Sequence, residues 1–273
     1  MPASALALAL SAALVHACWN LLLARPRDPE AAMAVALVVS IVAFAPVVAV
    51  FGHVDSRARP YLLVTGLFQL AYFALLGAAY RRLELSVVYP IARGSAPVLV
   101  LLAGVVAFGK STSWGQALGV LFVGGGVVLV SGLKHADRRG IAFGLAIAGC
   151  IASYTLIDKR GIRYASPIAY LELSMIIPTL VYATVVLRWK GRSAVRAAVS
   201  WPTCVAGLAT FVAYALVLAA LRLASAASVA AVRETSVLIA AALAGVFLKE
   251  RVGAERLTGA ACVVAGVALL SLA

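Results

Sequence analysis

The stretch VVYPIARGSAPVLV, residues 87–100, places one arginine inside an apolar run that otherwise suits lipid or a protein core. Arg93 lies eight residues past Leu85, where the run begins, so it sits roughly 12 Å inside a membrane helix. An arginine at that depth costs at least a few kcal/mol, and we therefore expect it to face a water-filled cavity or a partner. Pro90 and Pro97 flank it, and each removes a backbone donor, which predicts a helix that breaks or bends around Arg93.

A second stretch, SVAAVRETSVLI at residues 228–239, repeats this arrangement, with Arg233 standing 140 residues after Arg93. Residues 80–133 can be laid over residues 220–273 at that offset without a gap. The register matches arginines and helix-packing glycines: Arg82 with Arg222, Arg93 with Arg233, Gly119 with Gly259, and Gly126 with Gly266. Chance similarity between two apolar stretches is the alternative explanation. A true repeat would have a unit of five helices, and an odd number predicts a second half inverted relative to the first.

The composition is that of a membrane protein. Of 273 residues, 64% are hydrophobic and only 12% are charged, about half the charged fraction of a soluble domain. The net charge of +13 does not indicate nucleic-acid binding, because most Lys and Arg residues lie in short gaps between apolar blocks. The blocks predict an all-α integral membrane protein whose ten transmembrane helices form a 5+5 inverted repeat. The expected spans are 5–24, 31–51, 61–80, 85–108, 114–132, 141–157, 167–187, 202–221, 224–248 and 252–272.

Residues 1–133 are expected to form the first five-helix repeat, 134–140 a linker, and 141–273 the second repeat. The first apolar block is expected to stay in place as a helix, because no Lys or Arg precedes it and it continues past Cys18, unlike a cleaved signal peptide. The four cysteines are far apart and show no metal-ligand spacing, so we expect them to be small buried hydrophobes. The sequence predicts neither a metal site nor a cofactor.

Three stretches resemble the EamA-type transporters of the drug/metabolite transporter superfamily. HACWNLLL at residues 16–23 is similar to the family's first helix, and YTLIDKRG at 154–161 is similar to the start of its second half. FLKER at 247–251, followed by LTG at 257–259, is similar to the family's turn between helices nine and ten. In the first half, GKS at 109–111 replaces the Gly-Glu expected in that turn. The resemblance covers nearly the whole chain and implies a transporter of amino acids, other metabolites or drugs, commonly working by proton coupling or exchange.

Four charged residues inside the apolar blocks are candidates for the transport chemistry. Arg93 and Arg233 could bind a carboxylate or phosphate, because a guanidinium matches such groups with two parallel hydrogen bonds. The alternative is that each arginine pairs with a carboxylate or with carbonyls at a helix break. Glu172 and Glu234 could carry a coupling proton, since a buried carboxyl group can hold one at neutral pH. A fixed salt bridge is the alternative for Glu234. Asp158 stands beside Lys159 and Arg160 and is expected at the membrane interface.

Uncharged polar residues in the same blocks are further candidates for the substrate site. His16 and Asn20 are four residues apart and share one face of a helix. The others are Gln69, Tyr72, Tyr154 and Tyr214, with Tyr170 as an additional tyrosine of this kind. For each residue alone, a hydrogen bond between helices is the alternative, but together they indicate a polar interior.

These observations favour a secondary transporter that moves a small anionic or zwitterionic, amino acid-like metabolite by proton coupling or exchange. Its expected partners are the lipid bilayer, the small-molecule substrate and, if transport is coupled, protons. A lipid flippase or a structural membrane subunit is the alternative. An integral-membrane enzyme is disfavoured, because the sequence shows no paired acids, metal cluster or nucleophile with a base.

A multi-pass protein of the plasma (inner) membrane is expected, but its orientation is in conflict. Fourteen Lys and Arg residues lie in or beside the gaps that follow the odd-numbered spans, and seven lie in or beside the other gaps. The positive-inside rule therefore places both termini outside the cytoplasm. The family resemblance implies cytoplasmic termini instead.

Overall fold

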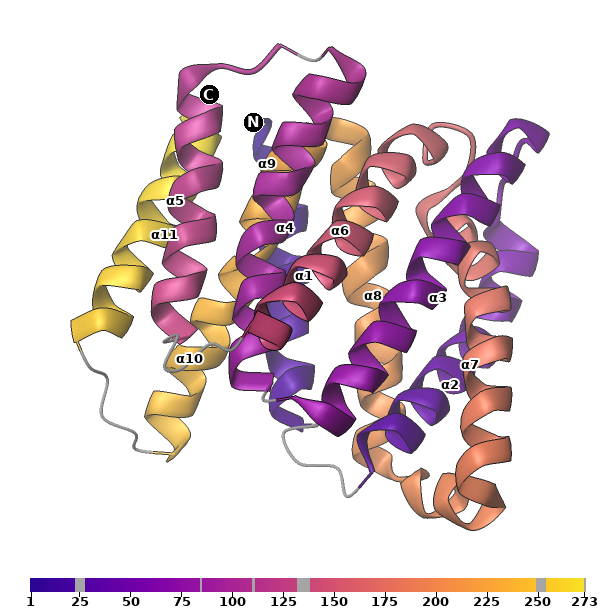
Figure 1. Cartoon of the computed structure of the whole chain (residues 1–273). Coiled ribbons are helices and arrows are strands. Elements are labelled where there is room, and N and C mark those ends of the chain that lie inside the picture. The colour runs from indigo at the N-terminus through magenta and orange to yellow at the C-terminus, as the bar shows by residue number, and fades with distance from the viewer. Residues whose placement is uncertain (23–27, 84, 110, 132–137, 249–253, 273) are drawn as a thin grey trace.

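The computed structural model describes residues 1–22, 28–83, 85–109, 111–131, 138–248 and 254–272. This part of the chain folds into a bundle of helices (Figure 1). The helices are α1 (Ala3–Leu22), α2 (Pro29–Phe51), α3 (Arg59–Arg82), α4 (Leu85–Phe108), α5 (Trp114–Ser131), α6 (Arg138–Gly161), α7 (Pro167–Ala198), α8 (Trp201–Leu223), α9 (Ala226–Arg233), α10 (Thr235–Leu248) and α11 (Ala254–Leu272). A short 3-10 helix, Ser56–Ala58, precedes α3.

The helices have the length and surface of a multi-pass membrane protein. Six segments among the described residues are long and apolar enough to cross a bilayer: Pro29–Phe51, Ser56–Ala79, Val88–Val106, Arg138–Gly161, Pro167–Ala198 and Trp201–Leu223. Shorter apolar helices cover Ala3–Cys18, Trp114–Val130 and Leu257–Leu272. Large apolar side chains such as Val42, Leu67 and Val106 are exposed on the outside of the bundle. A surface of this kind is suited to lipid rather than to water.

Local sequence signals explain where several helices begin. The carboxylate of Asp28 accepts a hydrogen bond from the Ala31 amide and so caps α2, with Pro29 in the first turn. Ser200 caps α8 in the same way, with Pro202 in the first turn. Helix α7 continues past the expected end at residue 187, but the backbone turns at Gly191, where φ is +80°. Residues other than glycine rarely adopt that conformation, so Gly191 redirects the last turns of α7.

The helix break that the sequence predicted in the first repeat is found in the second repeat instead. Helix α4 runs without interruption through Pro90 and Pro97, which corrects the expected break there. This helix packs closely against α5: a Cβ on Gly94 would lie 2.8 Å from the Gly124 carbonyl oxygen of α5. The expected span 224–248, which contains no proline, is instead divided at Glu234 into α9 and α10.

The glycines matched between the two halves bring α5 and α11 together. A Cβ added to Gly126 would lie 2.7 Å from the Gly259 carbonyl oxygen, and one added to Gly119 would lie 2.9 Å from the Gly266 carbonyl oxygen. The two helices lie side by side and antiparallel at one edge of the bundle (Figure 1). Because the two backbones are this close, only a hydrogen atom fits at the contact in place of a side chain. Small residues allow helices to approach each other in this way in lipid.

Both ends of the chain lie at the same end of the bundle (Figure 1). The amino group of Met1 lies 3.4 Å from the Leu270 carbonyl oxygen and 3.3 Å from that of Ser271. At this end the segments before α3 and α7 also pair, with the Asp55 amide donating to Tyr164 and the Ser166 amide to His53.

Candidate functional site

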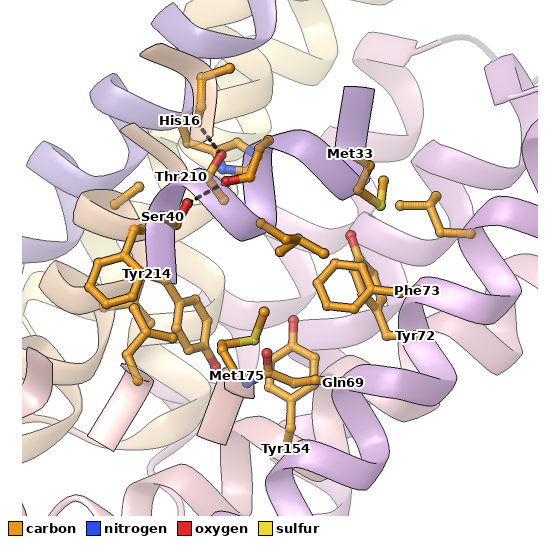
Figure 2. A pocket seen from close by; sticks show the side chains of 18 of the residues that line it. His16, Met33, Ser40, Gln69, Tyr72, Phe73, Tyr154, Met175, Thr210 and Tyr214 are labelled. Atoms are coloured by element: carbon orange, nitrogen blue, oxygen red, sulfur yellow. Dashed lines mark hydrogen bonds between the residues drawn. The ribbon is translucent and has the colours of Figure 1, made fainter. Parts of the chain in front are cut away.

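A cavity of about 680 Å³ lies between α1, α2, α3, α4, α6, α7, α8 and α9 (Figure 2). Its volume is within the range of small-molecule sites. Seven residues that the sequence singled out line it: His16, Gln69, Tyr72, Arg93, Tyr154, Tyr214 and Arg233. The structure thus brings together side chains from six different helices that are up to 217 positions apart in the chain.

The cavity wall is mainly aromatic and apolar. Tyr154 contacts both Tyr72 and Tyr214 edge-on, with ring centroids 6.3 and 5.9 Å apart. Phe73 continues this row of rings, in contact with Tyr72. Lining residues that the sequence reasoning missed are Met33, Ser40, Phe73, Tyr89, Met175 and Thr210. A single sequence does not indicate that these residues line a cavity, because serine, threonine, methionine and phenylalanine also occur commonly between packed helices.

Arg93, Arg233 and Glu234 form a buried charged centre at the cavity. Arg93 Nε lies 2.7 Å from Glu234 Oε2, although the angle is not that of a hydrogen bond. Arg93 also donates through Nη2 to Ser236 Oγ at 3.1 Å, and Arg233 Nη2 lies 3.5 Å from Glu234 Oε1. Within the described ranges two cations therefore share one carboxylate, which gives this centre an excess positive charge. Among the described residues, Arg233 Nε has no hydrogen-bond partner.

The break between α9 and α10 places these charges at favourable helix ends. Arg233 is the last residue of α9, where the helix dipole is negative, and Glu234 immediately precedes α10, where it is positive. The Glu234 amide donates to the Ala231 carbonyl, and the Thr235 hydroxyl donates to the Val232 carbonyl, so the turn is internally satisfied. The helix break and the ion pairs thus stabilise each other.

The two proton-coupling candidates occupy different places. Glu234 is enclosed by the arginines, and its side chain is fully buried. Glu172 is 3% exposed but does not line the cavity, and its Oε2 atom has no hydrogen-bond partner in the described part of the chain. The structure therefore does not bring Glu172 to the site. Asn20 lies in α1, but its side chain is outside the described residues.

Asp158 lies three residues before the end of α6 and is completely buried in the bundle. The sequence predicted a place at the membrane interface because of Lys159 and Arg160, and it did not predict this burial among other helices. It accepts hydrogen bonds from the hydroxyls of Thr65 at 2.6 Å and Tyr214 at 2.5 Å. The hydroxyl of Tyr170, which is also buried, lies 3.3 Å from that of Thr65. Asp158 is four residues after Tyr154 and shares its helix face, but this spacing alone does not predict the contact with Thr65.

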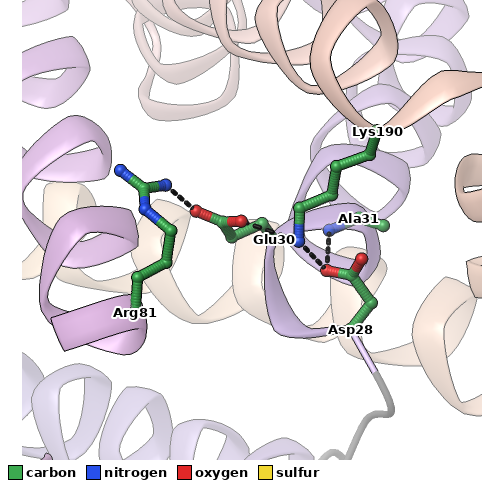
Figure 3. Close-up of polar contacts among 5 residues, drawn as sticks. All are labelled: Asp28, Glu30, Ala31, Arg81 and Lys190. Carbon is green, nitrogen blue, oxygen red and sulfur yellow. Dashed lines mark hydrogen bonds and ion pairs between the residues drawn. The ribbon is translucent and has the colours of Figure 1, made fainter.

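A second ionic cluster ties the N-terminus of α2 to α3 and α7 (Figure 3). Lys190 Nζ lies 2.6 Å from Asp28 Oδ1 and 2.7 Å from Glu30 Oε2, while Arg81 pairs with Glu30 Oε1. Partial burial raises the pKa of Asp28, but hydrogen bonds from Lys190 and the Ala31 amide outweigh it and hold that pKa below its ordinary value. Pro29, between the two acids, lines the cavity, so the cluster stands beside one end of it.

Comparison with known proteins gives the same architecture. The model of the EamA-like transporter family matches the chain twice, over residues 3–132 and 138–272. A crystal structure described only as that of a protein superposes with a TM-score of 0.79, over 100% of this chain and 98% of the other, at 16% identity. That likeness shows the fold alone. None of the curated proteins matches the chain. Because the two family matches together cover nearly every residue, the chain belongs to the EamA-like transporter family.

Proposed function

We propose that the chain is a secondary transporter that moves a small anionic or zwitterionic, amino acid-like metabolite across the plasma membrane, by proton coupling or exchange. The observation that carries this proposal is the charged centre, in which Arg93 and Arg233 line the cavity and, among the described residues, pair with the single carboxylate of Glu234. A buried excess cation is costly in the empty protein. A carboxylate or phosphate of the solute would neutralise it.

The geometry supports a ligand role more strongly for Arg233 than for Arg93. Arg93 lies close to Glu234 and donates to Ser236, whereas Arg233 is 3.5 Å from the same carboxylate. The Nε atoms of both arginines lack a hydrogen-bond partner among the described residues, so each is a donor that a solute oxygen could satisfy. The aromatic wall formed by Tyr72, Tyr154 and Tyr214 would then contact the rest of the solute.

The proposed mechanism uses a 5+5 inverted repeat with its site between the halves. Three observations support that architecture. The family model matches each half separately. The contact of Gly119 with Gly266 becomes that of Gly259 with Gly126 when each residue is exchanged for its partner 140 positions away, as a twofold axis requires. Counting α9 and α10 as one broken crossing, ten crossings return the chain to its starting side, where both termini lie.

The test is solute uptake by purified protein in liposomes. Labelled glutamate, alanine, leucine, lysine and succinate are offered with and without a proton gradient. We expect glutamate, succinate or a neutral amino acid to be taken up, and Arg233→Gln to reduce uptake about tenfold or more, as expected for loss of a hydrogen bond to a charged group. Arg138→Gln, at an exposed position of α6, is the matched control and should transport normally. Uptake of none of the five solutes, or scrambling of a fluorescent phospholipid instead, would overturn the proposal.

A further inference from the structure

Asp158 is a buried carboxyl group of α6 held by hydroxyls. Thr65 Oγ1 of α3 donates to Oδ1, and the Tyr214 hydroxyl of α8 donates to Oδ2. None of the ion pairs found within the described ranges includes Asp158. Its neighbour Lys159 donates to the Leu221 carbonyl. The carboxyl group is thus fully buried, and the described part of the chain shows no salt bridge to it.

A site of this kind can hold the carboxyl group of Asp158 in its ionised form and in its protonated form. An ionised carboxylate buried without a counter-ion costs several kcal/mol, so its neutral form becomes accessible. A hydroxyl can accept a hydrogen bond as well as donate one, and Thr65 and Tyr214 can therefore serve the protonated acid without leaving a buried polar atom unpaired. Glu234 differs, because two arginines lie within ion-pair distance of its carboxylate.

Tyr214 also connects this carboxyl group with the cavity. Its side chain lines the cavity wall, as Figure 2 shows, while its hydroxyl is bonded to Asp158, which does not line the wall. We propose that Asp158 is a proton-binding site of this transporter and exchanges its proton with water in the cavity through the Tyr214 hydroxyl. This inference rests on the proposed transport function and assigns the coupling proton to a residue other than Glu172 or Glu234.

The transfer is balanced by a single proton from a hydronium ion in the cavity. The O–H bond of Tyr214 breaks as its proton passes to Asp158 Oδ2, and a new O–H bond forms on the same tyrosine oxygen with the incoming proton. The hydroxyl then turns toward the cavity, so that two O–H groups do not face each other. The net change is one neutralised carboxylate and one water molecule in place of the hydronium ion. Release follows the same steps in reverse.

The charges around Asp158 give the sign of coupling to the solute. The groups that face it are Tyr170 of α7, Tyr214 of α8 and, at longer range, Arg233 of α9. On α4, Arg93 faces Glu234, and on α6 itself Tyr154 lies between Tyr214 and Tyr72. The charge of Arg233 favours ionised Asp158. A solute anion that neutralises Arg233 removes that influence, so anion and proton should bind cooperatively, and each should strengthen the binding of the other.

Infrared difference spectroscopy tests proton binding without any solute. Protein in lipid nanodiscs is stepped from about pH 8 to about pH 5, a range in which free carboxyl groups remain mostly ionised. We expect a carbonyl-stretch band of a newly protonated carboxyl group that disappears in Asp158→Asn. Tyr214→Phe and Thr65→Val should each shift this band, because each removes one hydrogen bond to the carboxyl group. Glu255→Gln, at an exposed position of α11, is the control and should leave the band unchanged.

The shifts in Tyr214→Phe and Thr65→Val decide the question even if Asp158→Asn fails to fold. A band that persists in folded Asp158→Asn, or that neither hydroxyl variant shifts, would overturn the inference. So would the absence of any band, which is the result for a carboxylate that only bridges helices.

Transport separates this inference from the proposed function. For a solute that the wild type accumulates with the proton gradient, Asp158→Asn should lose accumulation about tenfold or more while keeping exchange in the absence of a gradient. Full accumulation by Asp158→Asn refutes the proton site and leaves the transporter standing. A wild type that shows the Asp158 band but moves none of the five solutes refutes the proposed solute class and leaves the proton site standing.

Discussion

The buried carboxylate of Glu234 lies within ion-pair distance of two arginines. The effect of a single substitution on stability therefore depends on which of these charges it removes. Glu234→Gln would leave Arg93 and Arg233 close together without a counter-ion. Breaking a buried pair in this way costs about 3–5 kcal/mol. For a chain of this size, we expect thermal unfolding of the purified protein to begin on the order of 10 °C lower. Arg93→Ala should cost less, because Arg233 remains beside the carboxylate.

The double variant Arg93→Gln with Glu234→Gln is the informative control. It removes one charge of each sign, so it should recover most of the stability lost in Glu234→Gln. A single Glu234→Gln variant as stable as the wild type would show that the charged centre contributes nothing to the fold.

Rare polar residues were the best guide to the cavity. Arg93 and Arg233 could be placed near the interior from sequence, because lipid excludes them. The burial of Asp158 was not expected, since its sequence neighbours Lys159 and Arg160 indicated a helix end, and α6 does end close by, at Gly161. Its burial depends on Thr65, 93 positions away, and no local pattern carries such a contact.

The pairing of α5 with α11 provides a test at the level of an element. A methyl group on Gly126 would meet backbone atoms of α11, at 2.7 Å from the Gly259 oxygen and 2.9 Å from the Val263 nitrogen. Backbone cannot move aside cheaply, so Gly126→Ala should separate the helices and lower the melting temperature of the purified protein. Overpacking of this kind costs about 1–3 kcal/mol.

Gly125, the next residue of α5, is the matched control. Nothing lies within 4 Å of a Cβ built on it. Gly125→Ala should therefore leave the melting temperature unchanged or raise it, because alanine favours a helix over glycine by about 1 kcal/mol. Equal effects of the two substitutions would mean that general helix propensity, rather than the contact with α11, governs α5.

Helix breaks were harder to predict than helix contacts. Pro90 and Pro97 indicated a break, but the neighbours of α4 hold it as one helix. The real break, at Glu234, has neither proline nor glycine and depends on charges contributed by another helix. The glycine register was predictable because close backbone contact imposes a residue type, whereas a break stabilised by distant side chains imposes none.

For the whole bundle, the ionic cluster of Asp28, Glu30, Arg81 and Lys190 links three helices beside the cavity. Hydrogen bonds lower the pKa of Asp28 in the folded protein despite its partial burial. Ionised Asp28 therefore stabilises the fold above its unfolded-state pKa of about 3.9, and this stabilisation is lost as the pH falls through the lower folded-state value. The melting temperature of Asp28→Asn should lie below that of the wild type between about pH 5 and 8, and the difference should shrink below about pH 4.

Asparagine can still cap α2, so Asp28→Asn isolates the charge. Asp28→Ala loses the cap as well, and its deficit should persist in acid. If the deficit of Asp28→Asn did not depend on pH, the Lys190 contact would contribute nothing to stability.

The distribution of charges gives a prediction for the orientation of the whole molecule in the membrane. Twice as many Lys and Arg residues flank the gaps after the odd-numbered spans as flank the others, and Met1 and Leu270 meet at the end opposite the richer gaps. The positive-inside rule therefore predicts both termini outside the cytoplasm, against the cytoplasmic termini that the family resemblance implied. Alkaline phosphatase fused after Ala273 should be active and green fluorescent protein at the same point dark. The same reporters inserted between α5 and α6 should give the reverse. If only the C-terminal fluorescent fusion is bright, the termini are cytoplasmic, and the charge of the loops does not orient this bundle.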